Sequence, residues 1–420
     1  MMKKVVIIIS LAVIILIVLF LGKSIFLNNI SGIERQKSIS NNSNEEQDNN
    51  LFVGNSNYEI NNRYDIPSCG TNQKLFSYVP TDLDKIISLT PIGMVSPPDH
   101  VFPAPHSYFY IINPETPKNS EVNVYAPSDL VLKQIGIRHY NKIGSAENYI
   151  DYTLVFSPCK EFDLYYHHLK SLQFQPFINA ANKVIEKCSF TKDRNEDYCS
   201  GEVNIPIKKG EIIAKAGDLN AGVYGFDIGA RDFRLKREND FANPSRFCGN
   251  GNTFSHCYAV CFADYYTSDI TEKFKFSSLS PDGPKRDDLR CGNILSDKIG
   301  TVQGFWFFPE ENNNWQQSPE ENNLYIGPDN SNTPNKIFSV GKTIPNLKPG
   351  KYSFTIKENG NINIDPEKTN NSQIFCYNFD QGYNQGSILV QLTSLSNLKV
   401  EKVSSCSSMQ FTSNAVEFVR

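Results

Sequence analysis

Short runs of β-branched and aromatic residues recur along most of this chain, and they constrain its fold more than any other feature. Most of the runs are bounded by Pro, Gly or Asn. Five lie between residues 107 and 167, and eight or nine more follow residue 303. Such runs are typical of strands in antiparallel sheets, so a mainly β fold is expected.

The chain is long enough for two cores. It has 420 residues, 40% of them apolar and 12% aromatic, which suffices to bury two substantial cores. The net charge is −4 and the basic residues are scattered, so nucleic acid is not an expected partner. We expect five segments, which are a transmembrane anchor (1–24), a flexible polar linker (25–64), a β domain (65–275), a second linker (276–290) and a β-barrel (291–420).

The first residues indicate the compartment. Lys3 and Lys4 precede an apolar run, Val5–Gly22, that is interrupted only by Ser10. A helix of that length spans roughly 27 Å at about 1.5 Å per residue, which nearly matches a bilayer core. The run is longer than the apolar region of most cleaved signal peptides, so an uncleaved anchor is the preferred interpretation and a cleaved signal the alternative. We expect a single-pass protein of the cell membrane with most of its chain extracytoplasmic.

The ten cysteines agree with an oxidising compartment. Cys376 and Cys406 fall in the same late segment, and Cys188 and Cys199 bracket a charged loop, so these two pairs are predicted disulfides. The other six cannot be paired from sequence.

One helix is expected within the first β domain. Apolar residues recur at helical spacing between Leu172 and Cys188, and we interpret this segment as a helical insertion.

Four phrases of the first domain carry a resemblance. They are Val122–Gly136, Tyr165–Leu169, Ile205–Gly217 and Gly222–Ile228. Together they resemble the lysostaphin-type (LytM) zinc metallopeptidases over about residues 93–235. The resemblance implies the duplicated hybrid motif, a β-sandwich, and an ancestry among enzymes that mostly cleave peptidoglycan cross-links.

The resemblance also implies a degenerate metal site. The family binds zinc through the His and Asp of His-x-x-x-Asp and the second His of His-x-His, and a further His in Tyr-x-His-Leu assists catalysis. His106 matches the first ligand, but Tyr110 stands at the Asp position and Phe226 at the last His position. His168 matches the catalytic His. One ligand of three does not hold zinc in the family's manner, so no cofactor is expected unless the enzyme is active.

Two other groups of residues have side chains of the kinds that bind metals. His100, His106, His167, His168 and Asp227 are expected near the cleft, where a rearranged zinc site is an alternative to ordinary packing roles. His167 and His168 are consecutive on a predicted strand, so they are expected to point to opposite faces.

The second group lacks the spacing of a zinc knuckle. It comprises Cys248, His256, Cys257 and Cys261, for which disulfides are the preferred interpretation.

The last 130 residues suggest a closed barrel. Eight or nine strand-like runs in that length, Asn361–Ile364 among them, are typical of a small antiparallel barrel. Gly304-Phe-Trp306 resembles the Gly-x-Trp of lipocalin-like barrels. Trp306 is expected to fill the core, and a bound small ligand is an alternative.

Three functions compete on this evidence. The preferred one is a membrane-anchored, non-catalytic surface protein that binds a cell-envelope polymer, a surface protein or a small ligand through its peptidase-like domain. The second is a zinc-dependent cell-envelope peptidase with substituted ligands around His106 and His168. The third is a small-ligand carrier that acts through the C-terminal barrel.

Overall fold

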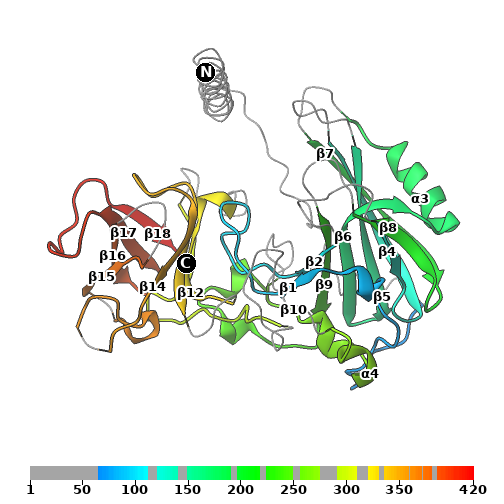
Figure 1. Cartoon of the computed structure of the whole chain (residues 1–420), viewed down its shortest axis with the longest axis horizontal. Helices are drawn as coiled ribbons and strands as arrows, with labels where there is room; N and C mark the ends of the chain where they lie inside the picture. Colours follow the sequence, from blue (N-terminus) through cyan, green and yellow to red (C-terminus); the bar gives the residue numbers. More distant parts are fainter. Residues whose placement is uncertain are drawn as a thin grey trace, which may run out of the picture. The chain divides into compact units, whose positions relative to one another are not determined.

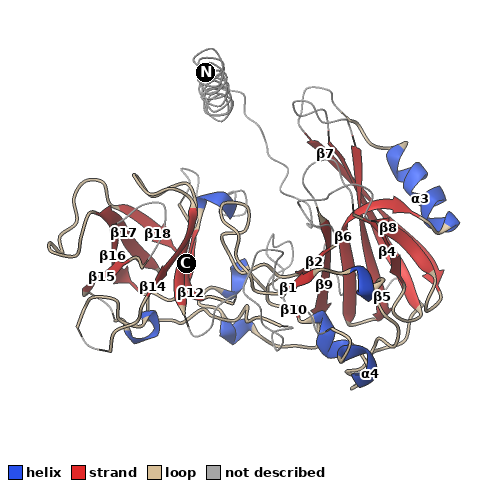
Figure 2. Ribbon diagram, in the orientation of Figure 1, coloured by secondary structure: helices blue, strands red, loops and turns tan. Residues whose placement is uncertain are grey.

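The computed structural model is mainly β, with several antiparallel sheets and few helices, as expected (Figure 1, Figure 2). It describes residues 65–111, 121–140, 149–190, 196–217, 224–248, 256–274, 291–309, 320–330, 335–358, 360–370, 372–380 and 386–420. The predicted anchor and both predicted linkers lie outside these residues. Among the residues described, no helix is long and apolar enough to cross a membrane.

The N-terminal sheet follows the strand order β1-β2-β9-β6-β5-β4-β7. Its strands are β1 (Ser88–Thr90), β2 (Ser107–Tyr110), β4 (Leu130–Tyr140), β5 (Tyr149–Cys159), β6 (Phe162–Leu172), β7 (Glu196–Ile207) and β9 (Gly225–Asp232). Three shorter strands extend it, which are β3 (Val122–Tyr125), β8 (Ile212–Ala216) and β10 (Ala259–Val260). β8 pairs with both β3 and β6, and β10 pairs with β9. All five strands predicted in this region are present.

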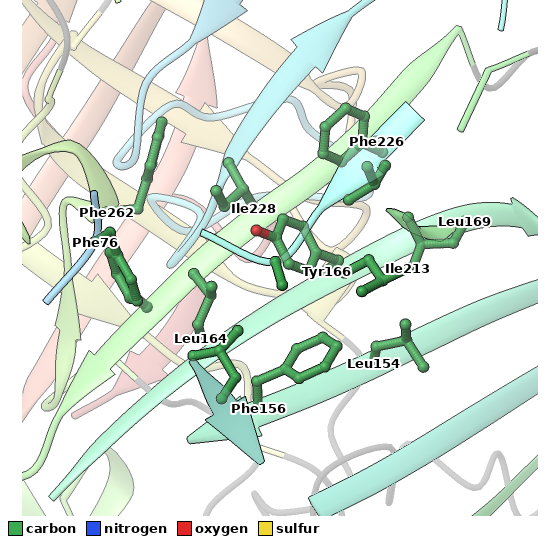
Figure 3. Close-up of a cluster of buried hydrophobic side chains, with 14 of the residues drawn as sticks. Phe76, Leu154, Phe156, Leu164, Tyr166, Leu169, Ile213, Phe226, Ile228 and Phe262 are labelled. Atoms are coloured by element: carbon green, nitrogen blue, oxygen red, sulfur yellow. The ribbon is translucent and has the colours of Figure 1, made fainter. Parts of the chain in front are cut away.

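Alternation along these strands separates an apolar face from a polar one. Leu154, Tyr166 and Phe226 are fully buried in the core, together with Phe76 and Phe262 from outside the strands (Figure 3). Polar neighbours on the same strands, such as His167 beside Tyr166 and Asp227 beside Phe226, face the other way. The polar face therefore carries the side chains that are able to bind a ligand or take part in a reaction.

The predicted helical insertion is present as α3 (Gln175–Ile185). Its buried residues are Phe177, Ala181 and Val184, at the spacing that the sequence pattern indicates. The helix packs on β4, β6 and β7. Gly201 in β7 permits this contact, because a Cβ there would lie 2.5 Å from Cγ2 of Val184.

The remaining helices are short. They are α4 (Ser268–Thr271), η2 (Leu83–Lys85), η3 (Glu238–Asp240), η4 (Pro244–Arg246), η5 (Phe262–Tyr265), η7 (Glu320–Asn322) and η8 (Pro366–Lys368).

The C-terminal region contains two four-stranded antiparallel sheets. The first comprises β11 (Gly304–Trp306), β12 (Leu324–Pro328), β13 (Lys336–Val340) and β14 (Gly350–Phe354). The second comprises β15 (Ile374–Asn378), β16 (Ser387–Ser394), β17 (Asn397–Val403) and β18 (Val416–Val419). Side chains from both sheets form one buried cluster, so the two sheets pack face to face.

The prediction of a closed barrel is therefore wrong. Between β14 and β15, the described residues contain isolated bridges and η8 but no strand, and the predicted strand Asn361–Ile364 contributes only to such bridges. A single bridge between Phe307 and Val419 joins the two sheets at another corner. Trp306 fills the interior between the sheets, and its Nε1 donates to the carbonyl oxygen of Val302 at 2.8 Å.

An aromatic cluster connects the two regions. The ring of Phe102 lies 5.2 Å from that of Phe305 and 5.1 Å from that of Phe307. The backbone N–H of Phe102 donates to Oε1 of Glu320 at 2.9 Å. These contacts extend the buried apolar surface from the segment before β2 to the first C-terminal sheet.

All ten cysteines form disulfides. The structure pairs Cys188 with Cys199 and Cys376 with Cys406, the two pairs that the sequence predicts. The other pairs are Cys69–Cys159, Cys248–Cys257 and Cys261–Cys291. Five disulfides indicate an extracytoplasmic location. They also leave no thiolate at Cys248, Cys257 or Cys261 for a metal.

Removal of the last disulfide tests how much it stabilises the C-terminal region. Cys376→Ala with Cys406→Ala opens a loop with a sequence separation of 30 residues, and we expect a loss of about 3–4 kcal/mol, because the unfolded chain gains entropy. The matched control is Cys188→Ala with Cys199→Ala, whose separation is 11 residues, and the expected loss is lower by about 1 kcal/mol. Calorimetry on each double variant measures both. A greater loss from the shorter loop would contradict the entropic explanation.

Candidate functional site

A β-bulge in β6 creates the most unusual local geometry of the N-terminal sheet. On one side, β6 pairs with β9 as far as His167, opposite Asp227, and then with β8 from Leu169. On the other side, β6 pairs with β5, with Tyr166 opposite Leu154 and Leu169 opposite Tyr152. Two steps along β5 therefore correspond to three along β6, so β6 contains one extra residue. His168 adopts φ of 61°, in the left-handed region that few residues other than glycine enter. The strand therefore interrupts its alternation at this residue.

The bulge brings both histidines to the same carboxylate. Nδ1 of His167 and Nε2 of His168 each lie 3.6 Å from Oδ2 of Asp227. The prediction that the two side chains point to opposite faces is wrong, because it assumes an unbroken strand. Bulges commonly redirect side chains in this way.

Asp227 is the centre of the group. Its side chain is 6% exposed, and Nδ1 of His106 lies 3.3 Å from its other oxygen, Oδ1. The ring of His100 lies 5.2 Å from that of His106. The side chains of His106, His167 and His168 are 13%, 17% and 25% exposed, so solvent reaches each of them. The structure thus brings together all five residues that the sequence analysis placed near a cleft.

A sixth residue, Asp151 of β5, completes this group, which we call the His–Asp cluster. Its Oδ2 lies 2.6 Å from Nδ1 of His168. Burial disfavours the charged imidazole, but Asp151 and Asp227 outweigh this effect and raise the pKa of His168 to about 9. His168 is therefore a cation at neutral pH, between two carboxylates.

The pKa values of the other members of the cluster shift in different directions. Burial opposes ionisation of Asp227, yet His106 and the other imidazoles hold its pKa well below the usual range. For His106, Asp227 outweighs burial and raises the pKa. Burial lowers the pKa of His167, and burial with repulsion from His106 lowers that of His100 to about 4. Burial raises the pKa of the nearby Glu320 to about 8, so this carboxyl group is largely neutral at pH 7.

The two positions that correspond to the family's other zinc ligands supply neither an imidazole nor a carboxylate. Tyr110 ends β2, and burial raises its pKa, which keeps the phenol protonated. Phe226 is fully buried, with its ring 5.3 Å from that of Phe109 and 6.1 Å from that of Tyr166. It lies on the apolar face of β9, whereas its neighbour Asp227 lies on the polar face. Tyr224 precedes β9 and is half-buried.

Zinc does not fit the cluster as it is arranged. Ligands of a tetrahedral zinc at about 2.0–2.2 Å lie roughly 3.3–3.6 Å apart, which is close to the distances from Asp227 to the imidazoles. In the described part of the chain, however, the only three His, Cys, Asp or Glu ligand atoms that lie within 4.8 Å of one another belong to Cys261, Asp264 and Cys291. Two of these form a disulfide. The imidazoles reach Asp227 but do not converge on one point.

Sequence reasoning missed two features of this site. Asp151 was not identified, although its position on β5 gives it the same face as His167 once the register is known. Asp227 was expected near the cleft, but no local motif indicates that three imidazoles surround it. Comparisons with protein-family models, with curated proteins and with solved structures find no match for this chain. The chemistry of the His–Asp cluster is therefore the basis for assigning a role.

The stability provided by His168 should depend on pH. Its pKa is raised from 6.5 to about 9 on folding, so its contribution is complete below pH 6.5 and is lost as the pH rises through 9. We expect His168→Asn, which tolerates the left-handed backbone, to cost about 1–2 kcal/mol at pH 6 and little above pH 9. Thermal unfolding across this pH range measures the difference.

His139→Gln is the matched control, because His139 lies on β4 outside the His–Asp cluster. A cost for His168→Asn that stays constant from pH 6 to pH 10 would show that the ion pair with Asp151 does not stabilise the fold.

Proposed function

We propose that this chain is a membrane-anchored, extracytoplasmic protein whose lysostaphin-peptidase-like β-sandwich domain is a non-catalytic binding module. The apolar run Val5–Gly22 supports the anchor, and the five disulfides support the location. The polar face around Asp227 supports a ligand site on the first domain.

The placement of Phe226 carries the non-catalytic assignment. A zinc peptidase needs three protein ligands and an open position for the attacking water. The side chain at position 226 points into the core and away from His106, so the ligand set of the family is absent from this face. Asp227, the carboxylate closest to His106, instead balances three imidazoles.

The protonation of His168 also supports a non-catalytic role. A general base must be unprotonated at the working pH to accept a proton. The carboxylates of Asp151 and Asp227 hold His168 as a cation with a pKa of about 9. The residue at the catalytic position thus serves better as a counter-ion than as a base.

The zinc peptidase with substituted ligands is the second candidate. One observation favours it, which is that four of the six histidines in the chain lie around Asp227. Zinc binding would require the imidazoles of His106, His167 and His168 to rotate toward a common point. Contacts with zinc would then replace the charge balance between these imidazoles and Asp227.

The carrier function loses its structural basis. It depended on the interior of a barrel, whereas the described part of residues 291–420 forms two sheets around a filled core. Trp306, Phe338 and Tyr377 are fully buried between these sheets.

Zinc content together with peptide hydrolysis tests the proposed function. The full chain, purified in a sugar-free zwitterionic detergent and incubated with zinc, should retain far less than one zinc per chain after dialysis. It should not hydrolyse pentaglycine or casein above the buffer rate. Elemental analysis and chromatography of the peptide products measure these two properties.

Three variants locate any activity that is found. His106→Ala and His168→Ala should leave both properties unchanged, as should His139→Ala outside the cluster. One zinc per chain, with hydrolysis that disappears only in the first two variants, would replace the binding module with the peptidase.

A further inference from the structure

A row of side chains crosses the polar face of the N-terminal sheet. The register aligns Tyr108 on β2 with Asp227 on β9 and His167 on β6. Beyond the bulge, it aligns Asp151 on β5 with Arg138 on β4 and Tyr198 on β7. The contact between His168 and Asp151 joins the two halves. We call these seven residues the polar row, and its six strands span about 24 Å at about 4.8 Å per strand.

Aromatic rings flank the polar row near both ends. The rings of Tyr108 and Tyr110 lie 4.6 Å apart at the β2 end. Beside Arg138, the rings of Tyr140 and Tyr149 stack at 4.4 Å. All four tyrosines are half-buried, so each keeps part of its surface exposed. Only glycine fits at position 225 beside these rings, because a Cβ there would lie 1.8 Å from the carbonyl oxygen of Phe109 and 2.9 Å from Cε1 of Tyr108.

The charges of the polar row are balanced internally. The carboxylates of Asp227 and Asp151 face the cation of His168, and Arg138 is the cross-strand neighbour of Asp151. Nδ1 of His106 also contacts Asp227. A ligand therefore does not have to supply charge, and a strongly charged polymer would compete with counter-ions already in place. This balance favours a ligand that is polar and uncharged.

The sheet face also disfavours a peptide strand. A peptide commonly binds a sheet by pairing with the free backbone groups of an edge strand. The polar row lies on strands whose backbone groups already pair with neighbours on both sides, apart from the terminal strand β7. Across β2, β9, β6, β5 and β4, a ligand can therefore bond to side chains but not to the backbone.

Sugar rings match what these side chains offer. Each hydroxyl both donates and accepts hydrogen bonds, as carboxylates, imidazoles and guanidinium groups require of a partner between them. The C–H faces of a sugar ring are apolar and pack against tyrosine rings. An extended chain of sugars would meet aromatic rings near both ends of the polar row and hydrogen-bonding groups between them.

We propose that the polar row binds a strand of neutral polysaccharide laid across the sheet. This proposal rests on the proposed function and names the ligand class of the binding module. The rings of Tyr108 and Tyr140 pack against sugar faces, and the half-buried side chains of His167 and Arg138 bond the hydroxyls between them.

Calorimetric titration of the full chain tests this proposal. The detergent is zwitterionic and free of sugar, and the probes are chitohexaose, cellohexaose and mannohexaose. We expect at least one of these neutral hexasaccharides to bind, and Tyr108→Ala to weaken that binding about tenfold, the effect of losing one aromatic stacking contact. A heparin hexasaccharide and pentaglycine are expected not to bind.

Two variants separate ring packing from general disturbance. Tyr108→Phe keeps the ring and should bind within about twofold of wild type, since only the hydroxyl is lost. Tyr78→Ala removes a tyrosine that is 37% exposed and lies outside the polar row, and it should bind like wild type. Each variant is first checked for an unchanged melting temperature and for the absence of free thiols.

Three results would overturn the proposal. They are no binding of any neutral hexasaccharide at millimolar concentration, tighter binding of heparin or pentaglycine, and unchanged binding by a folded Tyr108→Ala variant. Each differs from a failure of the proposed function, which is measured by zinc content and hydrolysis. A chain that binds zinc and cleaves peptides, yet ignores sugars, would refute both.

Discussion

The burial of the Asp227 carboxylate is the constraint on which the arrangement of the polar face depends. A carboxylate with 6% exposure is costly unless charges or hydrogen bonds compensate it. Three imidazoles supply that compensation, and the bulge in β6 is what allows two of them to come from consecutive residues. The left-handed backbone of His168 costs of order 1–3 kcal/mol, and its contacts with Asp151 and Asp227 offset that cost.

A second buried ionic group lies farther along the same face. Asp163 of β6 contacts Lys133 of β4 and lies 3.1 Å from NH2 of Arg231 on β9. The ring of Tyr165 separates this group from the His–Asp cluster and packs over Gly229, where a Cβ would lie 2.0 Å from the ring. The two groups serve different ends. Asp163 is fully buried and braces three strands, whereas the His–Asp cluster remains partly open to solvent.

Local patterns predicted the elements of this fold better than their connections. The helix α3 and the five strands β2 to β6 follow from local patterns of apolar, β-branched and aromatic residues, because burial imposes a period on each element. The barrel was wrong because a strand-like run does not reveal where the chain leaves a sheet, and Asn361–Ile364 forms bridges instead of a strand. The candidate site was likewise predicted only in part. The gathering of His106 and His168 was predictable, but the shared face of His167 and His168 depends on a bulge that no local pattern indicates.

The disulfide between Cys261 and Cys291 bears on how the chain would respond to proteolysis. It joins the end of the first domain to the start of the C-terminal region, on either side of residues 275–290. Cleavage of the backbone between these cysteines would leave the two parts covalently linked. Outside the cell, where proteases are common and thiols are oxidised, a nicked molecule would still carry its C-terminal sandwich. Separation of the two parts would require a reductant in addition to a protease.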